Sequence, residues 1–122
     1  MRRLYTLIQL LALSSLSIAM DKPGYRLTLD TRVENHQLTM APQINAPKGS
    51  VLRYEVVADK TGSSGNTSTR QGGQVKVDDA SATLSTFSLS LRPGDSCTVS
   101  VRVYDGANVV AERTIRCPAT AE

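Results

Sequence analysis

Short runs that alternate apolar and polar residues most restrict how this chain can fold. Residues 25–33, 37–44 and 51–58 all alternate, and in the third run Leu52 and Tyr54 fall on one side and Arg53 on the other. Side chains of a β-strand point alternately to the two faces of a sheet, so such runs indicate strands with one buried face. A sustained apolar period of roughly 3.6 residues, which would indicate helices, is not found. The pattern predicts an all-β protein.

Further runs at residues 82–91, 97–104 and 109–117 have the same character. With a short strand near residues 74–77, this makes about seven antiparallel strands at spacings of roughly 8–12 residues. Such a count is typical of an immunoglobulin-like or fibronectin III-like sandwich. Residues 61–73, rich in glycine, serine and threonine, favour a loop with a short edge strand, and the sequence leaves open whether the segment is an edge strand or a mobile loop.

The N-terminus has the features of a signal peptide. Arg2 and Arg3 precede a mostly apolar stretch that is shorter than the ~20 residues of a membrane span, and small residues end at Ala19. We therefore expect residues 1–19 to be removed after Ala19 and residues 20–122 to form one exported domain. Removal lowers the basic residues from 14 to 12, against 11 acidic residues, so the charge does not indicate nucleic acid as a partner.

The two cysteines predict a disulfide. In an exported chain an even number of cysteines favours a bond over free thiols. If residues 106–108 form a three-residue loop, the last two strands pair so that Cys97 faces Cys117 and Arg102 faces Glu112. The same register places Arg113 among apolar residues that face the core. Either the register or the burial of Arg113 in this prediction must therefore be wrong.

Residue patterns of enzymes are missing from the sequence. His36 is the only histidine and sits in a turn, so a two-histidine metal site is excluded. No serine lies in a Gly-x-Ser-x-Gly elbow, and the adjacent Asp78 and Asp79 would point to opposite faces of a strand. We therefore expect no catalytic residue, no metal and no cofactor.

Basic residues remain as candidates for binding. On a sheet built from the third and the last two strands, we expect the outward side chains to include Arg53, Arg102, Tyr104 and Arg116, with Glu55 and Glu112. Arg53, Arg70 and Arg116 have no obvious acidic partner in the sequence, and together with Lys60 and Lys76 they could form a diffuse basic face. The alternative is an ordinary solvated surface.

The chain from Val51 onward resembles the CsgC/CsgH family of curli-assembly proteins. The resemblance rests on residues 62–71 (GSSGNTSTRQ), 84–91 (LSTFSLSL), 93–95 (PGD) and 99–106 (VSVRVYDG). The Cys-x-Cys motif of enteric members is absent, since Ser50, Val51 and Leu52 occupy those positions. Thiol chemistry attached to that motif is therefore not expected here.

The resemblance implies a periplasmic, immunoglobulin-like chaperone that inhibits premature amyloid assembly of a curli-type subunit. Its client would be the Gln-, Asn- and Gly-rich repeats of that subunit. Transient binding through complementary charge would suit this role. Arg53 and Arg70 are the first candidates for client-binding residues, and Arg116 and Lys60 are the second. We expect a monomer. The alternative is a generic immunoglobulin-like adhesion or envelope-assembly module that binds a folded partner.

Overall fold

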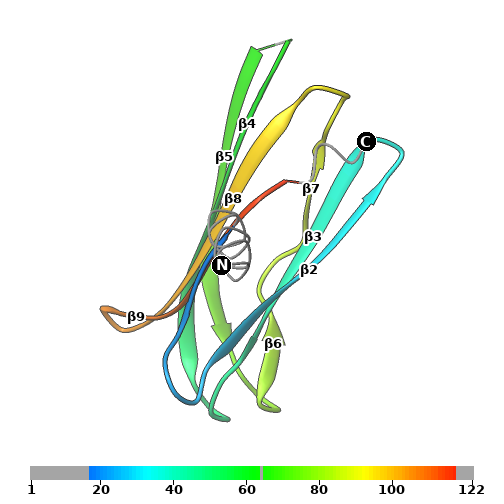
Figure 1. The fold of residues 1–122 in the computed structure, drawn as a ribbon. Helices are drawn as coiled ribbons and strands as arrows, with labels where there is room; N and C mark the ends of the chain where they lie inside the picture. Colours follow the sequence, from blue (N-terminus) through cyan, green and yellow to red (C-terminus); the bar gives the residue numbers. More distant parts are fainter. Residues whose placement is uncertain (1–16, 64, 118–122) are drawn as a thin grey trace, which may run out of the picture.

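The computed structural model describes residues 17–63 and 65–117, and it shows a sandwich of two antiparallel sheets (Figure 1). One sheet has the strand order β1-β9-β8-β4-β5, and the other has the order β2-β3-β6, with β7 also paired to β3. The predicted all-β sandwich is confirmed. The strands of the described residues are β1 (Ser17–Asp21), β2 (Arg26–Glu34), β3 (Gln37–Asn45), β4 (Val51–Gly62), β5 (Gly65–Lys76), β6 (Ser81–Thr83), β7 (Phe87–Ser90), β8 (Ser96–Asp105) and β9 (Asn108–Arg116).

An aliphatic core fills the space between the two sheets. Alternate residues of β3 supply one side of it, with Leu38 and Ile44 fully buried, and Val99 and Val101 of β8 supply the other side. Phe87, the single phenylalanine of the sequence, is also buried. The alternation read from the sequence therefore follows the inward and outward faces of the sheets. Within residues 17–63 and 65–117 we find no helical segment with the length and hydropathy of a membrane span.

The strand predicted over residues 82–91 is instead interrupted, giving β6 and β7. β6 pairs with residues 43–45 of β3 and β7 pairs with residues 37–40, so the gap lies opposite Ala41 and Pro42. The Leu84 N–H donates to the Pro42 carbonyl at 2.9 Å, which shows that the backbone of Pro42 faces this neighbour. Because proline has no N–H, the ladder loses a donor at this point. The prediction of one continuous strand was wrong for this reason.

The glycine-rich segment is a strand for almost its whole length. β5 pairs with β4 without a break from Gly65 to Lys76 and lies at the edge of its sheet. Of the two possibilities left open for residues 61–73, the edge strand is confirmed, and it is longer than the short strand expected. A Cβ atom at Gly73 would lie 2.9 Å from the Tyr54 hydroxyl. A glycine at this position therefore leaves room for the tyrosine side chain beneath the strand.

The register predicted for the last hairpin is confirmed over most of its length. Val99 faces Ile115 and Arg102 faces Glu112, as expected. The turn is shorter than predicted, because Asp105 already pairs with Asn108 and a bulge between Val103 and Tyr104 absorbs the difference. At the other end of the hairpin Cys97 and Cys117 form the predicted disulfide, with Cα atoms 5.0 Å apart.

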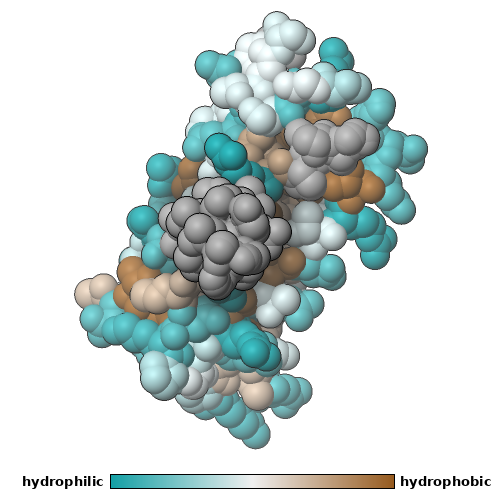
Figure 2. All heavy atoms as spheres, in the orientation of Figure 1, coloured by the Kyte–Doolittle hydropathy of each residue, from teal (hydrophilic) through white to brown (hydrophobic). Residues whose placement is uncertain are grey.

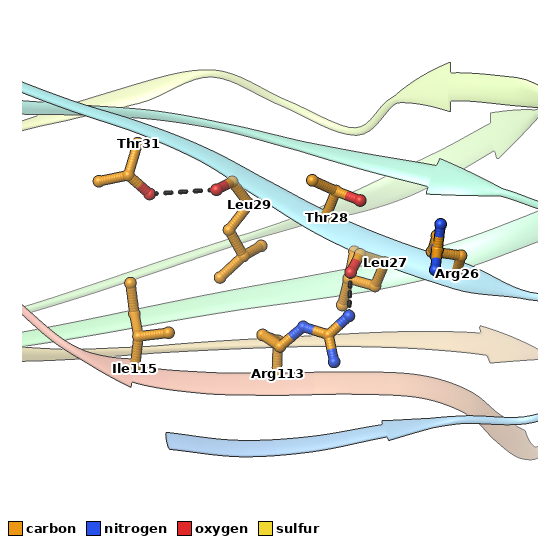
Figure 3. Close-up of a pocket in the computed structure, with 7 residues that line it drawn as sticks. All are labelled: Arg26, Leu27, Thr28, Leu29, Thr31, Arg113 and Ile115. Carbon is orange, nitrogen blue, oxygen red and sulfur yellow. Dashed lines mark hydrogen bonds between the residues drawn. The ribbon is translucent and has the colours of Figure 1, made fainter. Parts of the chain in front are cut away.

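Arg113 keeps the predicted register, opposite Val101, although its side chain points between the sheets. Its guanidinium donates to the backbone carbonyl of Leu27 on β2, across the mouth of the sandwich (Figure 3). It also donates to the Asp21 carboxylate at 3.3 Å. The charge is therefore satisfied at the rim of the core, and the conflict noted from the sequence disappears.

Strand β1 bears on the predicted signal peptide. Residues 1–16 of that segment lie outside the described residues, but Ser17 and Ala19 pair with Ile115 and Arg113 of β9. Removal of residues 1–19 would therefore cut through this strand. Only the part of β1 that includes Asp21, the partner of Arg113, would remain.

Candidate functional site

The basic residues singled out from the sequence lie mainly on one surface, which we call the outer face. It is the side of the five-stranded sheet turned away from β2 and β3, and it is formed by alternate residues of β5, β4, β8 and β9. Among the described residues no other strand covers it. The charged side chains of this face on these four strands are Arg53, Glu55, Asp59, Arg70, Lys76, Arg102, Glu112 and Arg116.

Arg53 lies over the ring of Tyr104 on the neighbouring strand β8. The two residues are directly paired, and the guanidinium carbon is 4.0 Å from the ring centroid. A guanidinium in this position is attracted by the negative face of the ring. Because the contact does not neutralise the charge, Arg53 presents a positioned cation to solvent, as the sequence suggested.

Arg70 has an acidic partner that the sequence did not reveal. Its guanidinium forms an ion pair with Glu55, although Arg70 itself is opposite Val57 and Glu55 is opposite Gly72. The Arg70 side chain is 66% exposed, so the pair is open to water. Such surface pairs contribute on the order of 0–1 kcal/mol, and the Arg70 charge remains accessible to a partner.

The glycine opposite Glu55 shapes the surface around this ion pair. Gly72 has no side chain, and a depression opens there between Arg53, Arg70 and Gln74. A second depression adjoins it on the other side of Arg70, toward Arg102. The outer face therefore has hollows lined by charged groups.

Arg102 forms the cross-strand ion pair that the hairpin register predicted. Its Nε atom donates to the Glu112 carboxylate at 2.8 Å. The hydrogen bond to Glu112 raises the pKa of Arg102 above its ordinary value, and a second bond to Tyr104 acts in the same direction. This arginine is charged at every physiological pH.

Arg116 belongs to the same face but to its other end. It is opposite Thr98, which in turn is opposite Asp59, whereas Arg53 is opposite Tyr104. Asp59 lies six positions after Arg53 on β4, which corresponds to about 20 Å along the strand. Arg116 therefore forms no cluster with Arg53 and Arg70, and it lines a hollow beside the disulfide instead.

Lys60 is not on the outer face. It follows the inward side of β4, where its ammonium donates to the Ser90 carbonyl at 3.0 Å and lies 4.0 Å from the Asp95 carboxylate. Only 17% of its side chain is exposed. Its contacts indicate a structural role, linking β4 to the turn before β8.

The predicted placement of Arg53, Glu55 and Tyr104 on one outward face is confirmed. The contacts of Arg53 with Tyr104 and of Arg70 with Glu55 were not predicted, because they depend on the registers of β4 with its two neighbours. The alternation of β4 did place Arg53 and Glu55 on the outward side, but it could not supply the β4–β5 register. Metal-ligand clustering is absent from the part of the chain that the structure describes. The arrangement offers a charged, hydrogen-bonding surface suited to binding another chain.

Comparisons with known proteins agree with this fold. The family of thin aggregative fimbriae synthesis proteins matches residues 16–114. The E. coli curli protein CsgC has a similar structure, with a TM-score of 0.62 and 22% sequence identity over 73% of this chain and 96% of that one. R. palustris CsgH is also similar, with a TM-score of 0.60 and 17% identity over 80% and 96% of the two chains. No curated protein sequence matches the chain.

Proposed function

Because the chain belongs to the thin aggregative fimbriae synthesis protein family, which acts in curli assembly, we propose that it is a periplasmic chaperone that delays amyloid assembly of a curli-type subunit. The family match over residues 16–114 is the observation that carries the proposal. The Cys97–Cys117 disulfide supports export, since such bonds persist mainly in oxidising compartments. The first 19 residues then serve as the signal peptide.

The outer face is the proposed binding surface. Its basic residues, which include Arg53, Arg70 and Arg116, outnumber its acidic residues on the four strands described above. An excess of positive charge speeds encounter with a client segment that carries acidic residues more than it tightens the complex. Fast encounter with weak binding suits a protein that occupies early assemblies and then leaves.

Amyloid growth explains why brief contact is sufficient. Each added chain needs the free backbone groups of a strand edge as its template. A protein that covers such an edge, or holds a monomer in another arrangement, removes the template for that time. No reaction is needed, so we propose a binding protein rather than an enzyme, without a metal or cofactor and acting as a monomer.

A thioflavin-T time course of a purified curli major subunit tests the proposal. Substoichiometric amounts of this protein should lengthen the lag before fibres form. An unchanged lag at equimolar protein would reject the chaperone and favour the alternative, an immunoglobulin-like module that docks a folded partner.

Charge reversal at Arg53 and Arg70 examines the outer face separately. The matched control reverses Arg26 and Arg32, two exposed arginines on β2 of the other sheet. Both double variants change the net charge by the same amount. A shorter lag with the first variant alone would therefore support the outer face rather than net charge.

A further inference from the structure

The free edge of the five-stranded sheet differs from the other strand edges of the described residues. β5 ends this sheet and runs for 12 residues without a bulge or a proline. The opposite edge, β1, has 5 residues, and the edge strands β6 and β7 have 3 and 4. β2 is longer, with 9 residues, but charged side chains recur along it at Arg26, Asp30, Arg32 and Glu34. Short edges and charges are the usual protection against strand addition. β5 is the longest of these edges and carries only Arg70 and Lys76 along its 12 residues, fewer charges than β2 has in 9.

Within residues 17–63 and 65–117, the backbone of β5 has a row of N–H and C=O groups that no other strand bonds. The Val77 N–H donates to Ser50 at 2.9 Å and the Val77 carbonyl accepts from Gly49 at 2.7 Å, so this residue faces β4. In an antiparallel ladder successive residues face alternate sides. Counting back along the unbroken register, the N–H and C=O groups of the even-numbered residues therefore point away from β4. These residues are Asn66, Ser68, Arg70, Gly72, Gln74 and Lys76.

The side chains of β5 select what such an edge can accept. The strand has hydroxyl, amide and glycine residues almost throughout, and Val75 is its only apolar side chain larger than alanine. Side chains on neighbouring strands lie about 5 Å apart, where amides and hydroxyls can bond to one another. Asparagine and glutamine form such ladders readily. An apolar strand would instead place its side chains against polar, exposed ones.

Charge decides between a client and a second copy of this chain. β5 contains two basic residues, Arg70 and Lys76, and no acidic residue. Pairing two copies of β5 would bring together two strands that are both positively charged, and facing like charges destabilise a sheet. A neutral or acidic segment has no such penalty.

We propose that the free edge of β5 binds an extended, Gln-, Asn- and Ser-rich segment of the client as an added strand. This inference rests on the proposed function and specifies its binding mode. Backbone hydrogen bonds supply the affinity, and the amide and hydroxyl side chains supply the selectivity. The added strand follows the twist of a small sandwich, which differs from the flat stacking of amyloid sheets. It is therefore a poor template for further growth while it is bound.

The end of the edge that projects is accessible. The tip of the β4–β5 hairpin extends beyond the rest of the sandwich (Figure 1), and the pair Gly62–Gly65 lies one position past the last β4–β8 pair at Thr61. Figure 2 shows this projecting end in pale colours of intermediate hydropathy, without an apolar patch. Its surface is suited to hydrogen bonding rather than to hydrophobic docking.

Amide hydrogen exchange measured by NMR is the direct test. The probe is a synthetic peptide that copies one Gln- and Asn-rich repeat of a curli major subunit, added unlabelled to the nitrogen-15-labelled protein. The free-side amides of Asn66, Ser68, Gly72 and Gln74 should exchange several-fold more slowly with the peptide. The amides of odd-numbered neighbours, already bonded to β4, should change much less. Protection confined to β8 and β9 would overturn the proposal, as would free-side protection that grows with protein concentration without peptide.

A pair of variants gives an independent test. Ser68→Pro with Gln74→Pro removes two free-side N–H groups, and proline is tolerated at edge positions whose N–H faces solvent. The control, Ser68→Thr with Gln74→Thr, keeps both donors. Relative to wild type, the proline variant should lose most of the lag extension in the thioflavin-T assay, and the threonine variant should keep it.

The outcomes separate this inference from the proposed function. If the wild type extends the lag and the proline variant does so equally, strand addition at β5 is wrong and the chaperone stands. If the wild type has no effect, the proposed function fails, whatever binds at β5. Should the proline variant not fold, the exchange experiment on the wild type still decides.

Discussion

Removal of the Cys97–Cys117 disulfide should cost a large share of the stability of this small domain. The suitable change is Cys97→Ala with Cys117→Ala, because both positions are buried, at 5% and 8% exposure, and alanine adds no buried polar group. The bond joins residues 20 positions apart at the ends of β8 and β9. The backbone hydrogen bond from Cys117 to Cys97 would still be able to form in the variant.

The expected loss follows from the length of the closed loop. In the chain-entropy model a loop of this size lowers the entropy of the unfolded chain enough to stabilise the fold by about 3 kcal/mol. A domain of about 100 residues has roughly 5–15 kcal/mol in total. The variant should therefore unfold about 12–24 °C lower, at the roughly 4–8 °C per kcal/mol that applies to small domains.

Urea unfolding followed by circular dichroism measures this loss. The free energy of unfolding should fall by about 3 kcal/mol from the oxidised wild type to the variant. A reductant should lower the stability of the wild type toward the same value and leave the variant unchanged. A difference below about 1 kcal/mol would refute the reasoning, since it would mean that the β8–β9 hairpin restricts the unfolded chain without the bond.

Three further outcomes are expected. With the variant Arg53→Glu with Arg70→Glu, the thioflavin-T lag should be shorter than with wild type. Added salt should reduce the wild-type effect on the lag, because exposed charges are screened. Equal inhibition of fibre formation by the variant would reject the outer face as the binding surface. Leu38→Ala should cost about 2–5 kcal/mol in urea unfolding, whereas Val51→Ala at a half-exposed position should cost far less. Gly73→Val should destabilise by at least about 1 kcal/mol and move the NMR signals of the tyrosine beneath it.

The predicted fold was accurate where neighbouring strands are joined by short turns. The register of the last hairpin followed from its turn and its alternation, and the structure shifts it only beyond the bulge at Tyr104. The prediction of one continuous strand over residues 82–91 was wrong because the sequence does not show which strand pairs with it. The missing donor at Pro42 interrupts a strand some 40 positions away, and only the pairing of β3 with β6 and β7 reveals this.

Only part of the candidate site was predicted, because the local pattern of one strand does not show its neighbours. Arg53 was placed outward by the alternation of its own strand, which is a local property. Lys60 follows the inward side of that strand, and its contact with Asp95 depends on a turn that lies far along the chain. The Glu55 partner of Arg70 depends on the register between β4 and β5, which a segment rich in glycine and serine does not specify through an apolar pattern.

By itself, the sequence determined the all-β class, the inward and outward faces of most strands and the pairing of Cys97 with Cys117. Each of these follows from alternation along one strand or from a short turn between two. The tertiary structure alone decided that β5 is a long free edge and that Arg70 lies on the outer face beside Glu55. Those properties depend on which distant segments become neighbours, and that choice is made by burying the core as a whole.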